Sequence, residues 1–291
     1  MSNEIRIDAL MPPEMAVRAE EIGVRKANLD ALTTFVLAVL AGAFISLGAI
    51  FATTVTAGAA EVLPWGVTRL LAGLVFCLGL ILVVVAGAEL FTGNNLIVMA
   101  WASRKVSITR LLRNWGVVFV GNFAGALATV VIMHISGQHN FGAGAVGAAA
   151  LATAKAKVEL GFIEAIALGI FCNALVCLAV WMTYSARTTT DRILAILFPI
   201  TAFVAAGFEH SVANMYFIPI GLLIRDLATP EFWTMIGQAS ADYDSLTWGA
   251  FLLRNLLPVT LGNIIGGGLM VGVVYWFIYL RPRHTAAGSE N

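Results

Sequence analysis

The segments AGAELFTGN, residues 86–94, and AGFEHSVAN, residues 206–214, are polar insertions within two long apolar runs. At an offset of 120 positions, Ala86-Gly87 aligns with Ala206-Gly207, Glu89 with Glu209, and Asn94 with Asn214. Carboxylates and amides are costly at membrane depth unless the helix breaks and lines a protein-walled cavity. The two segments therefore predict two interrupted membrane spans.

Composition places the whole chain in a membrane. Of 291 residues, 59% are hydrophobic and only 12% are charged, whereas soluble domains carry roughly 25% charged residues. The 17 basic residues are balanced by 17 acidic ones, which argues against a nucleic-acid partner. The uncharged runs are long enough to cross a hydrocarbon core of about 30 Å. We therefore expect an all-α polytopic membrane protein.

Six spans are predicted, and the polar insertions interrupt the second and the fifth. The expected spans are 33–51, 66–100, 111–135, 160–184, 193–223 and 248–280. They form a channel domain over 33–280, between an N-terminal segment 1–32 and a tail 281–291. After Pro12 and Pro13, the apolar side of 14–26 predicts an amphipathic helix on the membrane surface, or alternatively a solvated tail.

The two halves of the domain resemble each other in sequence. At an offset of 141, Leu111–Asn114 aligns with Leu252–Asn255, and Gly121-Asn122 aligns with Gly262-Asn263; at an offset of 127, Phe35, Gly42 and Phe44 align with Phe162, Gly169 and Phe171. Three spans per half is an odd number, so the second copy must enter from the opposite side. This predicts an inverted repeat with copies near 33–136 and 160–280, as in many transporters.

The basic residues predict the orientation. Most of the 17 lysines and arginines lie in the two termini and in the connections that follow spans two and four. Since cytoplasmic loops are enriched in such residues, both termini are expected in the cytoplasm.

Each interruption would start a half-helix near the bilayer midplane. Helix starts carry unpaired N–H groups and about half a positive charge, so they attract anions. His210 is the single histidine within the interruption of a predicted span, which makes it a functional candidate. The alternative is a structural histidine that only pins the broken helix by hydrogen bonding. Thr92, in the matching break, could bond the ring, the solute or its own backbone.

Two further groups of residues flank the breaks. Unpaired carboxylates at Glu89 and Glu209 would repel an anion, so they are expected to support the breaks by capping N–H groups or by bonding to Asn122 and Asn263. Bulky apolar groups nearby predict a constriction that strips water from a solute, although each could equally be ordinary packing. These constriction candidates are Phe76, Leu80, Leu90, Phe91 and Phe203.

The sequence contains no sign of catalysis. There is no phosphate-binding loop, no nucleophile elbow, and no cysteine or histidine spacing typical of zinc. The three cysteines all lie in apolar runs. We therefore expect neither enzyme activity, nor a cofactor, nor a metal.

Three motifs resemble those of a known family. The runs Ala88–Asn94, Gly207–Met215 and Pro258–Gly267 resemble the signatures of the formate/nitrite transporter family. The resemblance extends from about residue 10 to 281. It is strongest to the formate channel branch, through Pro230–Trp233 and Val176–Trp181.

The resemblance implies an aquaporin-like six-span fold and a homopentamer with one pore through each protomer. It implies that His210 and Thr92 meet at the pore centre with Asn173 nearby. It also implies a constriction on each side of this centre, from Phe76 and Phe203 toward the outside and Leu80 and Leu90 toward the inside, and Lys157 in the outer vestibule.

The leading hypothesis is a passive or proton-linked channel for small monovalent anions, most of all formate, in the bacterial inner membrane. His210 would either stabilise the anion or lend it a proton. A nitrite or hydrosulfide channel of the same family is the main alternative. A neutral-solute pore of the aquaporin kind lacks support, because paired Asn-Pro-Ala motifs are absent. A non-conducting scaffold or receptor would not need His210 at the midplane.

Overall fold

The computed structural model describes residues 9–281, so the predictions for residues 1–8 and for the tail from 282 onward lie outside the described residues. All regular elements of the described part are helical. Within residues 9–281, six helices are long and apolar enough to span a membrane: Ala31–Thr56, Trp65–Gly87, Ile108–Ile135, Phe162–Thr183, Thr189–Ala206 and Ala250–Leu280. The predicted all-α, six-span fold is confirmed.

The α-helices follow one another with short connections. They are α1 (Pro12–Asn28), α2 (Ala31–Thr56), α3 (Trp65–Ile81), α4 (Val98–Ala102), α5 (Ile108–Ile135), α6 (Ala145–Val158), α7 (Phe162–Thr183), α8 (Thr189–Ala206), α9 (Ser211–Leu227), α10 (Pro230–Ile236) and α11 (Leu257–Asn263). A wide π-helical segment, Leu82–Gly87, extends α3, and similar segments precede and follow α11 in the last span.

Helical structure stops inside both polar insertions. The α3 span ends at Gly87, with φ of +84°, and helical turns resume at Gly93. Helix α8 ends at Ala206, Gly207 has φ of +79°, and α9 begins at Ser211. A glycine in the left-handed region is the usual way to end a helix, because it carries no Cβ. These glycines therefore set where each helix stops.

The register between the halves differs from the sequence alignment for the first and fourth spans. The side-chain amide of Asn122 donates to Ala38 O, and that of Asn263 donates to Gly169 O. Ala38 and Gly169 are 131 positions apart, so the predicted offset of 127 is wrong by about one helical turn.

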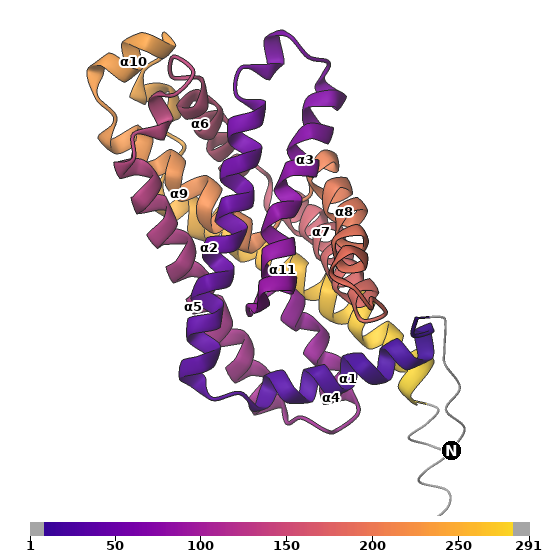
Figure 1. The fold of residues 1–291 in the computed structure, drawn as a ribbon. Coiled ribbons are helices and arrows are strands. Elements are labelled where there is room, and N and C mark those ends of the chain that lie inside the picture. The colour runs from indigo at the N-terminus through magenta and orange to yellow at the C-terminus, as the bar shows by residue number, and fades with distance from the viewer. Residues whose placement is uncertain (1–8, 282–291) are drawn as a thin grey trace, which may run out of the picture.

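Helix α1 lies across one end of the bundle, and α10 lies at the other end (Figure 1). We call these ends the α1 face and the α10 face. The apolar side of α1, with Ala16 and Ala19, is buried against Met99 and Val271 of the same chain. This corrects the expectation that the apolar side of the segment rests on lipid. Helix α6 was not predicted, and it lies toward the α10 face.

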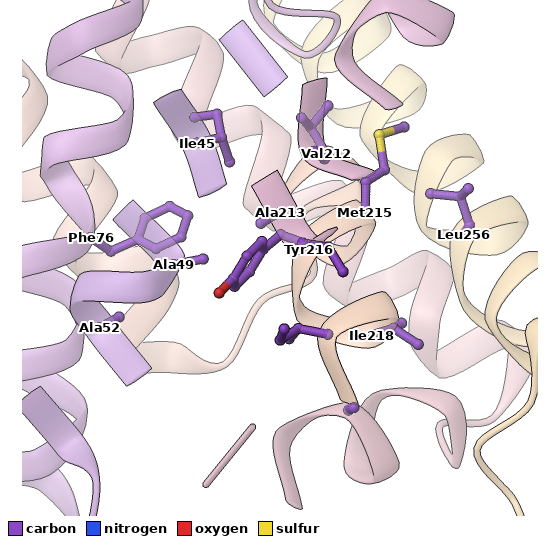
Figure 2. Close-up of a cluster of buried hydrophobic side chains, with 14 of the residues drawn as sticks. Ile45, Ala49, Ala52, Phe76, Val212, Ala213, Met215, Tyr216, Ile218 and Leu256 are labelled. Atoms are coloured by element: carbon purple, nitrogen blue, oxygen red, sulfur yellow. The ribbon is translucent and has the colours of Figure 1, made fainter. Parts of the chain in front are cut away.

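The core between the spans is apolar and is built largely from small residues and aromatic rings. Figure 2 shows Phe76 of α3 and Tyr216 of α9 in one cluster with Ile45 and Ala49 of α2. Each of these four side chains is buried. The cluster fixes the first helices of one half against the start of α9, and so it positions the second interruption.

Candidate functional site

Two cavities enter the bundle from opposite faces. The α10-face cavity has a volume of about 630 Å³ and reaches Phe76, Phe203 and His210. The α1-face cavity has a volume of about 430 Å³ and reaches Leu80 and Leu90. The helix interruptions lie where the two cavities approach each other.

Aromatic rings close the inner end of the α10-face cavity. The Phe76 and Phe203 ring centroids are 5.7 Å apart with the planes at 85°, and the Phe203 ring stacks on that of His210 at 5.9 Å. All three side chains are almost fully buried. This arrangement places an apolar barrier directly beside the imidazole.

The inner end of the α1-face cavity is lined by Leu80 and Leu90, both about as buried as the rings. Phe91 lines neither cavity. Its ring packs edge-on against Phe119 at 5.1 Å and Trp115 at 6.1 Å. The other four constriction candidates therefore lie at the inner ends of the two cavities. The contacts of Phe91 are those of a packing residue.

His210 caps the start of α9 and bonds across to the other interruption. Its Nδ1 accepts the backbone N–H of Ala213 at 3.0 Å, and its Nε2 lies 3.0 Å from Thr92 Oγ1. Because Nδ1 acts as an acceptor, the proton of the neutral ring belongs on Nε2, from which it is donated to Thr92 Oγ1. The expectation that these two side chains lie together is met by the geometry.

Asn173 of α7 is completely buried and holds the backbone around Thr92. Its Nδ2 lies 2.8 Å from Asn95 Oδ1, 2.7 Å from Asn263 O and 3.3 Å from Thr92 O. It lines neither cavity. The side chain is near the predicted centre, as expected, and it contacts protein groups there.

A carboxylate cluster lies beside each interruption. On the α1 face, the Glu89 carboxylate is 3.1 Å from Lys26 Nζ and accepts from Asn94 Nδ2 at 2.6 Å. Asn94 Oδ1 in turn accepts from Lys26 Nζ at 2.8 Å, and its amide also donates to Asn114. The negative charge is thus compensated within the cluster.

The α10 face carries the matching cluster. The Glu209 carboxylate is 2.6 Å from Lys157 Nζ and accepts from Asn214 Nδ2 at 2.7 Å and from Asn255 Nδ2 at 3.2 Å. Lys157 Nζ also lies 5.5 Å from the centre of the Phe217 ring. Lys157 lines the α10-face cavity.

Asn122 and Asn263 bind backbone rather than carboxylates. Asn122 accepts from the N–H of Phe91 at 2.9 Å and donates to Glu89 O; Asn263 accepts from Ser211 N–H at 2.9 Å and donates to Glu209 O. The expectation that the two carboxylates bond to these amides is wrong. The amides instead satisfy main-chain groups that the interrupted helices leave unpaired.

The charged residues at the cavities that the sequence did not predict include Lys26 and Arg69. Lys26 lies 131 positions before Lys157. The same offset relates Ala38 in the first span to Gly169 in the fourth, so an alignment in this register would have matched the two lysines. Arg69, in α3, lines the α10-face cavity. A lone arginine inside an apolar span is itself a signal, because such residues are costly in a bilayer.

Within residues 9–281, no group of three or more histidine, cysteine, aspartate or glutamate side chains is arranged to hold a metal ion. The three cysteines, Cys77, Cys172 and Cys177, are buried and unpaired.

Comparison with known proteins extends over nearly the whole chain. A family model described as formate/nitrite transporter matches residues 13–277. The chain is 50% identical over 274 residues to the formate channel FocA of Escherichia coli (strain K12), covering 94% of this chain and 96% of the relative. It is 44% identical over 265 residues to FocA of Haemophilus influenzae, covering 91% and 93%. A solved structure described as a pentameric formate channel with formate bound superposes with a TM-score of 0.82 at 48% identity, covering 86% of this chain and 98% of that one.

Proposed function

Because the chain belongs to the formate/nitrite transporter family, we propose that it is a membrane channel that conducts small monovalent anions, with formate as its main solute. The observation that carries the proposal is the hydrogen bond between His210 and Thr92, placed between two cavities that enter from opposite faces. The formate channels among its relatives support the choice of solute.

The route begins in either cavity. On the α10 face, Lys157 and the start of α9 attract the anion, because a helix start carries about half a positive charge. The apolar rings of Phe76 and Phe203 then strip water from it. Polar groups at His210 and Thr92 replace that water for a moment, which suits conduction because the anion is held weakly.

We propose that His210 acts through its Nε2–H bond to the Thr92 hydroxyl. The hydroxyl accepts from the ring and can direct its own proton toward an anion. A doubly protonated ring would need a proton on Nδ1, which faces the N–H of Ala213. That clash favours a neutral ring that stabilises the anion, over a charged ring that gives the anion a proton.

On the far side of this centre, Leu80 and Leu90 would form the second constriction, before the α1-face cavity with Lys26. Glu89, Glu209, Asn122 and Asn263 would hold the interrupted helices in place, as their hydrogen bonds suggest. None of these groups needs to react with the solute. The protein in this proposal is therefore a conductor without catalytic activity.

We also propose that the two halves, near 33–136 and 160–280, are inverted copies. The matched bonds of Asn122 and Asn263, and of Glu89 and Glu209, support this relationship. With segment 1–32 and tail 281–291 in the cytoplasm, the α1 face is the cytoplasmic side of a bacterial inner membrane. The amphipathic segment then contributes Lys26 to the inner mouth.

A homopentamer with one pore in each protomer completes the proposal. The solved relative at 48% identity is described as pentameric. Large apolar side chains on the outer surface, such as Ile163 at 75% exposed and Phe198 at 76% exposed, suit contact with lipid or with another copy.

Liposomes that contain the purified protein test the function. Flux of formate, nitrite and hydrosulfide is compared, alone and in competition, for the parent chain and for His210→Ala. We expect formate to be fastest and His210→Ala to lower its flux by at least about 10-fold, the effect of losing one hydrogen bond to a charged group. His139→Ala, in the connection after α5, is the matched control. Parent-like formate flux in His210→Ala would refute the mechanism, and faster nitrite or hydrosulfide flux would reassign the solute.

A further inference from the structure

Arg69 is a charged residue inside a membrane span, and its side chain is directed at the second helix interruption. Its Nε donates to Ala205 O at 3.2 Å, and its Nη2 donates to Val204 O. Ala205 and Val204 lie in the last turn of α8. Carbonyls in the last turn of a helix lack partners within that helix. Val204 O also accepts the N–H of Gly207 at 3.1 Å, so Arg69 adds a second donor there and supplies a donor to Ala205 O.

The end of α8 matters for any anion in the α10-face cavity. An interrupted helix has two ends, and while the start of α9 attracts an anion, the end of α8 carries about half a negative charge. Val204 and Gly207 line the same cavity as His210. Left alone, the end of α8 would offset much of the attraction from the start of α9.

The guanidinium of Arg69 places a full positive charge on this helix end. Gly207 lies directly beside the guanidinium, since a Cβ at Gly207 would be in ordinary van der Waals contact with Arg69 Nη2, at 3.5 Å. Arg69 and Lys157 line one cavity, and the charge of Lys157 is partly compensated by Glu209 at 2.6 Å. Arg69 makes no ion pair among the described residues, so its charge is compensated by the carbonyl dipoles and, at longer range, by the Glu209 carboxylate.

The first interruption is built differently. Arg192 lines the α1-face cavity beside Val84 and Gly87. Within the described residues, its side chain makes no hydrogen bond to the carbonyls at that helix end. The two mouths therefore differ in how the negative end of the broken helix is compensated.

We propose that Arg69 governs anion entry from the α10 face: it neutralises the carbonyl end of α8 and, with Lys157, attracts anions into this cavity. The proposal rests on the proposed channel function. A charged wall within a low-dielectric cavity raises the local concentration of the opposite charge, so Arg69 acts on entry from the α10 face.

Single-channel currents in planar bilayers test this. Formate current is recorded at both voltage polarities, in about 10 mM and about 1 M salt, where the screening lengths are roughly 30 Å and 3 Å. Arg69→Gln is expected to lower the low-salt current by roughly 3- to 10-fold, mostly at the polarity that draws anions in from the α10 face. The loss should shrink in high salt. Arg69→Lys, which keeps the charge, should retain at least about half of the current.

Controls separate charge from structure. Lys155→Gln removes one charge from α6 outside the cavity, where Lys155 Nζ bonds to Asp242 O at 2.9 Å, and it should leave the current and its rectification unchanged. Arg69→Met replaces Arg69→Gln if the latter does not assemble. An equal loss in both salts with unchanged rectification, a loss in Arg69→Lys as large as in the neutral variant, or no loss at all would each overturn the proposal. A parent chain without anion current would instead overturn the channel function itself.

Discussion

Thr92 Oγ1 lies 3.0 Å from His210 Nε2, so a single hydrogen bond joins two interruptions that are 118 positions apart in the chain. Each partner is also tied to its own segment. His210 Nδ1 accepts from Ala213 N–H, and Thr92 O accepts from Asn173 Nδ2. The bond is therefore held from both sides, and the orientation of the hydroxyl depends on the ring.

Replacing Thr92 by valine removes the hydroxyl while keeping the shape of the side chain. Because the hydroxyl is proposed to present its proton to the anion, formate flux should fall by roughly 10- to 100-fold, the range for one hydrogen bond to a charged group. Thr92→Ser keeps the hydroxyl and should stay within about threefold of the parent flux. Stopped-flow measurement of formate entry into liposomes checks both values.

The serine variant is the control for packing, since it loses a methyl group where valine loses the hydroxyl. If Thr92→Val conducted formate like the parent, the hydroxyl would have no contact with the solute. If both variants failed equally, disturbed packing of the site would account for the loss, and the hydroxyl would have no separate role.

Asn263 is expected to be essential for the stability of the second interruption. Its buried side chain bonds to Ser211 N–H, Gly169 O and Glu209 O. Asn263→Ala leaves the Ser211 N–H and Glu209 O without this partner, at about 1–3 kcal/mol each, whereas Gly169 O, within α7, keeps its helical bond. We expect the melting temperature in detergent to fall by roughly 10 °C, and Asn122→Ala, with matching partners, to behave alike.

The exposed Asn140 provides the comparison, because among the described residues its side chain hydrogen-bonds only to the His139 ring. Asn140→Ala should change stability by no more than about 0.5 kcal/mol. A small effect of Asn263→Ala would show that water or a shift of the helices replaces the lost amide.

The six spans and the sites of both interruptions could be predicted from sequence, because burial in lipid leaves a simple pattern. A polar cluster such as Glu209-His210-Ser211 inside an apolar run has few explanations other than a break. The pairing of His210 with Thr92 followed from the family resemblance and not from spacing. The helices and the location of the site were therefore predictable.

The partners of buried polar groups were less predictable. Which carbonyl Asn122 meets depends on how closely α2 and α5 approach, and a shift of one turn leaves the hydrophobic pattern nearly unchanged. The same uncertainty hid the match between Lys26 and Lys157. Arg69 reaches the end of α8, over 130 positions away, and no local pattern encodes such a contact.

The stability of the connection between α5 and α6 should depend on pH through His139. Burial of the ring, together with the neighbouring His134 imidazole, lowers the pKa of His139 below its usual 6.5. A lowered pKa means that the unfolded chain takes up the proton first. The contribution of the neutral His139 ring to stability is therefore complete above about pH 6.5, and it is lost as the pH falls through the lowered pKa of the folded state.

The melting temperature of the parent should accordingly decrease between about pH 7 and about pH 5, and His139→Gln should make this decrease shallower. The rings of His134 and His139 stack at 5.3 Å, so a charge on His139 would have to form against a neighbouring ring. An unchanged slope in His139→Gln would assign the pH dependence to other groups.

Glycine at position 125 lets α2 and α5 come into backbone contact, and its substitution should separate them. A Cβ at Gly125 would lie 2.0 Å from Val39 O, whereas a Cβ at Gly116, in the same helix, would meet nothing within 4 Å. Gly125→Ala should lower stability by about 3 kcal/mol or more, since a backbone carbonyl cannot move as a side chain can. Gly116→Ala should be neutral or stabilising by up to about 1 kcal/mol, from helix propensity alone. Thermal unfolding of the two variants in one detergent tests this directly. Equal stabilities of the two variants would mean that α2 and α5 do not pack in this register. The offset of 131 between the two halves would then be wrong as well.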